Sequence, residues 1–197
     1  AVVALPVGTG DALQLEGLQL PGVRHVGSLA EIGEFAEAVD RQLHIAQGLE
    51  AVERIVEEGK IKGYYGPLVE NFTLTNPKYR VPVEVAANNA LFNVVVEDDD
   101  VASALIKKLT KDNLGRLTFM PLKQLSVQAL TYPQSSDVHP LMKVALRFDP
   151  KMEKAMSQVF GKKLIARDFD TARQFATECN MDAITMEGDE VNRKGAL

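Results

Sequence analysis

Several kinds of residue that specialised chemistry requires are scarce in this 197-residue chain. It contains one cysteine, Cys179, no tryptophan, and three histidines that lie far apart, His25, His44 and His139. A single cysteine excludes an internal disulfide framework and a zinc site built from several cysteines. The scattered histidines argue against histidine-rich metal chemistry, and the low cysteine content is typical of a reducing compartment.

Long apolar runs are also missing. No stretch approaches the roughly 18 consecutive apolar residues that a membrane span needs, and no basic and apolar leader opens the chain. We therefore expect no membrane segment. Hydrophobic residues make up 46% and charged residues 25% of the chain. This is the balance of an ordinary globular protein of one domain or two small subdomains.

The net charge of −5 is unevenly distributed along the chain. Residues 1–40 contain six acidic residues and one basic residue, whereas residues 41–197 contain 21 of each. Tight binding to phosphates needs an excess of lysine and arginine, so this balance argues against a dedicated nucleic-acid domain. A local cluster of basic residues on one face of the protein remains compatible with this charge balance.

The hydrophobic periodicity predicts two helical segments in the first third of the chain. One covers residues 29–39, and the other is ended by Gly59. Apolar residues of the second recur at spacings of four, three and four: Ile45, Leu49, Val52 and Val56. This spacing is typical of the end of a coiled coil and equally of an amphipathic helix packed on its own core.

Helices and strands alternate in the rest of the chain. The expected helices cover residues 79–87, 98–111, 152–159 and 170–179, the last capped by Asp170. The expected strands cover residues 91–96, 116–119, 163–166 and 183–186, while 141–148 fits a strand or a short helix. Strand–helix–strand order occurs twice, over 91–119 and over 163–186. The sequence therefore predicts an α/β (mixed α+β) protein of two similar halves.

No motif predicts a catalytic, cofactor-binding or metal-binding residue. The Gly161-Lys162 pair lacks the other residues of a phosphate-binding loop. The acidic run 97–100 fits the start of a helix better than a metal site, because adjacent helical carboxylates point in different directions. Cys179 fits a buried, unreactive thiol. An α/β enzyme whose site is assembled from distant residues stays open as an alternative.

Several segments resemble the hinge domain of structural maintenance of chromosomes (SMC) proteins. They are KYRVPVEVAANNALFNVVV at 78–96, GRLTFMPL at 115–122, VFGK at 159–162, AITMEGD at 183–189 and GAL at 195–197. Together with Tyr132-Pro133, this pattern is most similar to the cohesin branch of the family. The resemblance covers about residues 43–197. It departs from the family at Asn88, where relatives usually carry glycine.

The resemblance implies an SMC hinge fold with two similar subdomains, mixed sheets and a short coiled-coil stub. Residues 41–59 would be the end of the coiled coil, residues 60–130 the first subdomain, and residues 131–197 the second. Residues 1–40 would be an extension of unknown role.

The resemblance also implies a non-enzymatic function, namely pairing with the hinge of the other cohesin SMC subunit. The resulting heterodimer would close a ring that entraps sister DNAs in the nucleus, on the chromosome. Cofactors, a membrane and a small-molecule substrate would have no part in this function. A hinge that pairs with itself is an alternative.

Two sets of residues follow from the resemblance. The expected dimer-interface residues are Leu91, Phe92, Val94, Gly188 and Gly195. The expected sites of weak, non-specific DNA contact are Lys107, Lys108, Lys111, Lys162, Lys163, Arg167, Arg193 and Lys194.

Overall fold

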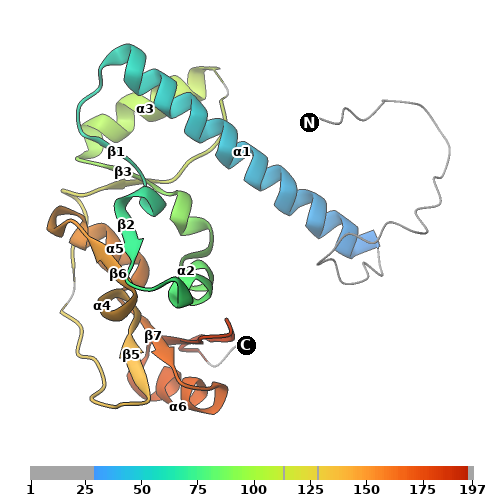
Figure 1. Cartoon of the computed structure of the whole chain (residues 1–197). Coiled ribbons are helices and arrows are strands. Elements are labelled where there is room, and N and C mark those ends of the chain that lie inside the picture. The colour runs from blue at the N-terminus through green and yellow to red at the C-terminus, as the bar shows by residue number, and fades with distance from the viewer. Residues whose placement is uncertain (1–28, 113, 128, 195–197) are drawn as a thin grey trace. The chain divides into compact units, whose positions relative to one another are not determined.

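The computed structural model describes residues 29–112, 114–127 and 129–194, with side chains from Gln42 onward (Figure 1). The chain divides into two compact units, residues 1–40 and residues 41–197. Helix α1 (Leu29–Gly59) begins in the first unit and ends in the second. The helix predicted over 29–39 is thus observed, and the rest of the predicted extension lies outside the described residues.

The first half of the second unit is a small mixed sheet with one helical crossover. Its strands are β1 (Tyr64–Pro67), β3 (Val94–Val96) and β4 (Phe119–Pro121), in the order β1-β3-β4. Helix α3 (Asp99–Asp112) connects β3 to β4, which run parallel, and β1 is antiparallel to β3. Asp98 accepts a hydrogen bond from the Val101 amide at the start of α3, as its acidic beginning predicts.

The second half repeats this pattern with one more strand. Its sheet has the order β5 (Val138–Pro140), β7 (Lys163–Ala166), β8 (Asp182–Thr185), β9 (Glu190–Val191). Helix α6 (Phe169–Cys179) connects the parallel strands β7 and β8, and β5 is antiparallel to β7. The prediction of two similar α/β halves is therefore confirmed.

Between the two sheets lies a layer shared by both halves. Strand β2 (Phe72–Leu74) from the first half pairs with β6 (Leu146–Phe148) from the second. The helices of this layer are α2 (Arg80–Ala87), α4 (Leu141–Ala145) and α5 (Glu153–Phe160). Short 3-10 turns cover Leu68–Asn71, Pro77–Tyr79, Asn88–Phe92 and Pro150–Met152. The segment 141–148 is thus a short helix followed by a strand.

No described helix could cross a lipid bilayer.

Buried side chains form three clusters, one for each sheet and one in the shared layer. The shared cluster includes Leu68 from the first half and Phe160 from the second, and the Phe72 and Phe160 rings meet edge to face at 5.8 Å. The predicted boundary at residue 130 is therefore crossed by a continuous core.

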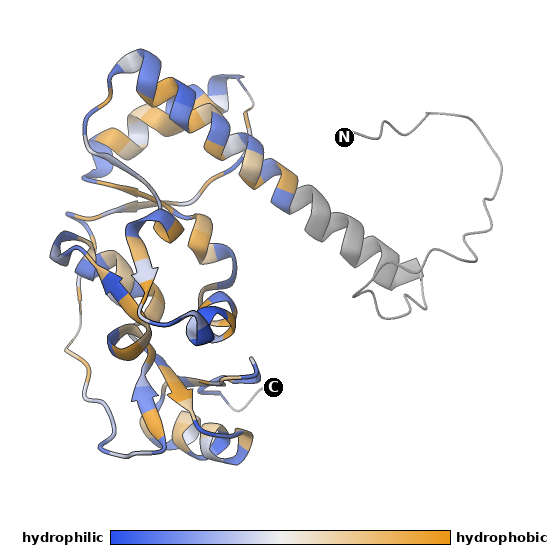
Figure 2. Cartoon of the chain, in the orientation of Figure 1, coloured by the Kyte–Doolittle hydropathy of each residue, from blue (hydrophilic) through white to orange (hydrophobic). Residues whose placement is uncertain are grey.

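The last turns of α1 belong to the core of the first half. Val52 is fully buried, and Leu49 and Val56 are packed against the same cluster as Leu105 of α3. Both helices are striped with apolar and hydrophilic residues in Figure 2. The apolar spacing in this helix therefore serves packing within the chain from Leu49 onward.

Two helix ends differ from the predictions. Helix α1 ends in a Schellman motif in which Lys60, not Gly59, has the left-handed conformation, with φ 46°. The Lys60 amide donates to the Glu57 carbonyl and the Ile61 amide donates to the Val56 carbonyl. Helix α6 is capped by Asp168, not Asp170, because the Asp168 carboxylate accepts from the Thr171 amide at 2.8 Å.

Two strands begin later than predicted. Residues 88–92 form a 3-10 turn, so β3 starts only at Val94. Strand β4 starts at Phe119 because Gly115, with φ 106°, first carries the chain close to α1. A Cβ atom on Gly115 would lie 2.6 Å from the His44 carbonyl oxygen, so the close approach requires glycine.

Candidate dimer interface and basic surfaces

Strand β4 forms one edge of the first sheet. The Thr118 carbonyl accepts from the Val94 amide at 2.8 Å, and the Leu122 amide donates to the Val96 carbonyl at 2.9 Å. These bonds to β3 leave the Phe119 amide facing the opposite side, where no strand of the described chain pairs with β4. The edge can therefore accept a strand from another polypeptide.

Two hollows lie beside this edge. One of about 450 Å³ is lined mainly by small and apolar residues of α2, β4 and α5, among them Ala86, Ala87 and Phe119. The other, of about 230 Å³, includes Phe92 and Leu117. Because both hollows include Asn93 and Thr118, they form one continuous concave surface, which we call the β4 groove. Small residues beside a free strand edge permit close approach of a partner backbone.

The structure separates the three interface residues predicted in this half. Phe92 is 38% exposed and lies in the β4 groove. Leu91 is half-buried against the shared core. Val94 is fully buried, because β1 and β4 pair with both sides of its strand and α1 and α3 contribute to the cluster around it. Val94 is therefore a core residue and not part of a surface.

The two predicted interface glycines have different outcomes. Gly188, with φ 100°, lies in the turn between β8 and β9, and a Cβ atom there would lie 2.9 Å from a methyl group of Val81 in α2. The contact with Val81 of the same chain therefore explains why position 188 is glycine, without any contact from a partner. Gly195 lies outside the described residues. Strand β9 pairs with β8 on one side, and on its other side no described strand pairs with it.

Sequence reasoning missed Phe119 and Pro121 as residues of the exposed edge. A signal was present, because proline lacks the amide that a central strand donates and is confined to edges and bulges. Pro121, directly after a predicted strand, could have identified the edge of the first sheet.

The eight predicted DNA-contact residues do not form a single surface. Lys107, Lys108 and Lys111 are exposed on α3, in the first half. The Lys108 ammonium lies near Gly59, at the carboxyl end of α1, where a cation is favoured by the helix dipole. We call these three residues the α3 lysines.

Two of the predicted cations are already neutralised within the chain. Arg167 pairs with Asp137 at 2.7 Å and with Asp168 at 2.8 Å. Lys163 pairs with Glu190 at 2.8 Å and with Asp182 at 3.0 Å. Because their charges are matched, these two side chains are poor candidates for binding phosphate.

The Lys163 network joins three strands, and its groups are largely withdrawn from solvent. Burial alone would disfavour the ammonium, but the hydrogen bonds to Glu190 and Asp182 outweigh it and raise the pKa of Lys163. Burial likewise disfavours the Asp182 carboxylate, but the Arg193 amide and Lys163 outweigh it and lower the pKa of Asp182. The Lys163 ammonium and the Asp182 carboxylate are therefore both charged near neutral pH.

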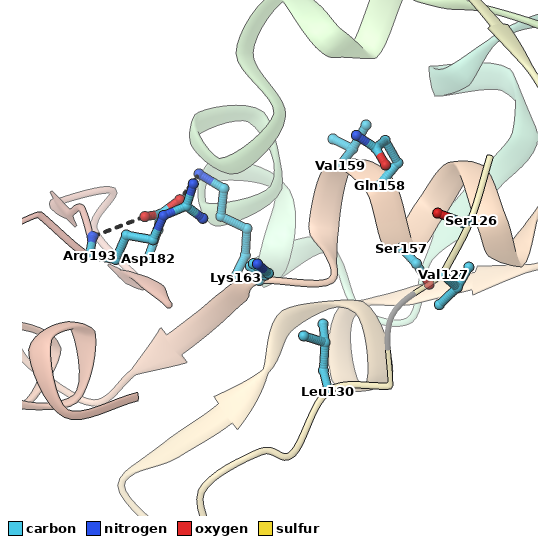
Figure 3. A pocket seen from close by; sticks show the side chains of 10 residues that line it. Ser126, Val127, Leu130, Ser157, Gln158, Val159, Lys163, Asp182 and Arg193 are labelled. Carbon is cyan, nitrogen blue, oxygen red and sulfur yellow. Dashed lines mark hydrogen bonds and ion pairs between the residues drawn. The ribbon is translucent and has the colours of Figure 1, made fainter. Parts of the chain in front are cut away.

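The remaining three cations are exposed beside this network. Lys162 and Arg193 line a hollow of about 420 Å³ together with Lys163 and Asp182. Figure 3 shows Arg193, Asp182 and Lys163 in this lining, and Lys194 follows Arg193 in the sequence. The structure thus divides the unneutralised cations between α3 and this hollow.

Metal binding and nucleophilic chemistry each place specific requirements on the described residues. No group of three or more histidine, cysteine, aspartate or glutamate side chains in this part of the chain is placed to hold a metal ion. Burial, with a smaller effect from Glu178, raises the pKa of the Cys179 thiol, which disfavours the reactive thiolate. Burial also raises the pKa of Tyr64 to about 12.

Comparison with known proteins identifies the family to which the chain belongs. The sequence model described as "SMC proteins Flexible Hinge Domain" matches residues 61–176, more than half of the chain. The chain belongs to the SMC hinge family.

The relatives agree with this assignment. The chain is 43% identical over 153 residues to structural maintenance of chromosomes protein 3 of Arabidopsis thaliana, covering 78% of this chain and 12% of that protein. A solved Pyrococcus furiosus Smc hinge domain with an extended coiled coil has a TM-score of 0.68 and 31% identity, covering 84% of this chain and 59% of that one. A structure of the folded elbow of cohesin has a TM-score of 0.69 and 29% identity, covering 85% and 26%.

These findings confirm the predicted fold and family. The hinge is a dimerisation domain of SMC proteins, not a catalytic one, and pairs with the hinge of another SMC chain. Relatives from Arabidopsis thaliana and Dictyostelium discoideum are both named structural maintenance of chromosomes protein 3. The chain spans 12% of the length of the plant relative.

Proposed function

We propose that this chain is the hinge of a cohesin SMC subunit and forms a heterodimer with the hinge of the other SMC subunit. In the full-length proteins this pairing would close one end of a ring that entraps sister DNAs on the chromosome, in the nucleus. The free edge of β4, with the groove beside it, carries the proposal.

The physical basis is that each half ends in an edge strand, β4 in the first and β9 in the second, and one side of each pairs with no described strand. A partner strand along β4 would satisfy the outward-facing Phe119 amide. It would also bury Phe92, which is a large apolar side chain to leave 38% exposed. Pairing at two such edges would give a closed, ring-shaped dimer.

The experiment is to mix the chain with the partner hinge and measure association by sedimentation velocity. We expect a one-to-one complex, and we expect Phe92→Glu to weaken it at least tenfold, because a carboxylate would be desolvated in the groove. Phe169→Glu is the matched control, since Phe169 is 39% exposed but lies at the start of α6. Equal effects of the two substitutions, or independent sedimentation of the two hinges, would refute the proposal.

Amide hydrogen exchange in the same mixture tests the strand edge directly. The Phe119 amide should exchange rapidly in the chain alone and become protected in the complex. The Leu122 amide already donates to Val96, so its protection should change little. If the chain alone sediments as a dimer with Phe119 protected, then the self-pairing alternative is correct.

We also propose weak contact with DNA through the α3 lysines. These three side chains are exposed, and none belongs to an ion pair of the described chain. Because residues 41–197 carry no net charge, such binding would be weak, independent of base sequence and strongly salt-dependent.

A further inference from the structure

The hollow of about 420 Å³ beside the Lys163 network has the size of a small-molecule site. Its walls come from the end of α5, the loop after β4, and the beginnings of β7 and β8 (Figure 3). With Arg193, which follows β9, five separate segments of the chain thus converge on one concave surface. We call it the α5 hollow.

The charged groups of the α5 hollow leave two cations available. Lys163 is held by Asp182 and by Glu190, which lies outside the lining. Both Asp182 oxygens are engaged, one by the Lys163 ammonium and the other by the Arg193 amide at 3.0 Å. No salt bridge joins the Lys162 ammonium or the Arg193 guanidinium to a described carboxylate, although the charge of Arg193 acts on Asp182 at longer range and contributes to its lowered pKa.

Neutral hydrogen-bond donors complete the lining. The Gln158 amide has no partner among the described hydrogen bonds, and Ser126 contributes a hydroxyl group. The Ser157 hydroxyl donates to the sulfur of Met142, at 3.7 Å, which is a weak acceptor. The α5 hollow thus presents several hydrogen-bond donors beside its two cations.

We propose that the α5 hollow binds a small polyphosphate, a function beyond dimerisation. Two cations and neutral donors distributed over the hollow match a ligand with several anionic oxygens. A single phosphate would fill only part of this volume, and duplex DNA is too wide to enter it. Nucleoside triphosphates and inositol polyphosphates share this chemistry.

The test is isothermal titration calorimetry of the chain with sodium tripolyphosphate at constant ionic strength. We expect saturable one-to-one binding, and we expect the double variant Lys162→Gln, Arg193→Gln to weaken it at least tenfold. The matched control, Lys107→Gln with Lys111→Gln on α3, removes the same charge and should change the affinity less than twofold. Titration with ATP and with inositol hexakisphosphate then identifies which source binds more tightly.

A second readout separates binding from loss of fold. Tripolyphosphate should raise the unfolding temperature of the parent chain and of the α3 control, but not that of the Lys162 and Arg193 variant. Absence of saturable binding, or equal weakening by both double variants, would overturn the proposal. Displacement of tripolyphosphate by duplex DNA at this site would instead identify a nucleic-acid contact and also overturn it.

Discussion

Asn88 adopts a backbone conformation that favours glycine, with φ 46° and ψ −130°. It links the end of α2 to the 3-10 turn that precedes β3. Such angles cost a residue with a side chain on the order of 1–3 kcal/mol. With ψ −130° these angles lie outside the left-handed helical region that asparagine visits most readily, so the strain at Asn88 is not relieved by its side chain.

We predict that Asn88→Gly raises the free energy of unfolding by about 1 kcal/mol, because it relieves this strain. The neighbouring Asn89→Gly is the matched control. Asn89 does not have a positive φ, so glycine there should only add freedom to the unfolded chain and lower stability. Urea unfolding monitored by circular dichroism measures both. A decrease in stability for Asn88→Gly would contradict this account of the turn.

The strands of the second sheet are joined by side chains as well as by backbone hydrogen bonds. Lys163 in β7 contacts Asp182 in β8 and Glu190 in β9, and the Lys163 and Asp182 side chains are only 16% and 15% exposed. Removing one partner of a largely buried ion pair leaves the other charge uncompensated. This network therefore stabilises the short strand β9, which carries the free edge of the second half.

We predict that Asp182→Asn lowers the free energy of unfolding by about 1–3 kcal/mol near neutral pH. The effect should depend on pH in a defined direction. Because the folded-state pKa of Asp182 is lowered, its contribution is present above its unfolded pKa of about 4 and is lost as pH falls through the folded value. The raised pKa of Lys163 gives a contribution present below about pH 10 and lost as pH rises through the folded value.

Urea unfolding between about pH 3 and pH 8 tests this prediction. The parent chain should lose stability on acidification more steeply than Asp182→Asn. Asp137→Asn is the control, because Asp137 pairs with an Arg167 side chain that is 65% exposed, and exposed pairs contribute little. An unchanged acid dependence in Asp182→Asn would exclude a stabilising role for the network.

For the molecule as a whole, the distribution of neutralised and free cations predicts where the proposed DNA contact would lie. The α3 lysines are free, whereas the charge of Arg167 is matched by Asp137 and Asp168. Replacing Lys107, Lys108 and Lys111 by glutamine should therefore weaken DNA binding. The plot of log affinity against log salt should become shallower by about 2 to 3, since each lost phosphate contact removes about 0.9 from the slope.

Fluorescence anisotropy of a labelled duplex, measured over a series of salt concentrations, gives this slope. Arg167→Gln should leave the slope unchanged, because it removes a charge that is already paired. A triple variant with the slope of the parent chain would show that α3 does not contact DNA.

Patterns of neighbouring residues in the sequence were sufficient to predict much of the secondary structure of this protein. The order of helices and strands and the two similar halves follow from apolar periodicity and turn residues, which depend on neighbouring residues. The SMC hinge family was identified separately, by the resemblance of short segments to known hinges, and comparison with known proteins confirmed it. The β7 strand, for example, has the predicted bounds 163–166. The start of β3 was missed because a single residue with positive φ, Asn88, introduces a turn into an otherwise strand-like apolar run.

Only the tertiary structure decided which residues are available to a partner. Phe92 and Val94 are both apolar and two positions apart, yet one is in the β4 groove and the other is fully buried. Lys162 and Lys163 are adjacent, yet only Lys163 is neutralised, by carboxylates that include Glu190, 27 positions away. Exposure and charge pairing depend on segments distant in the chain, so periodicity and spacing could not determine them.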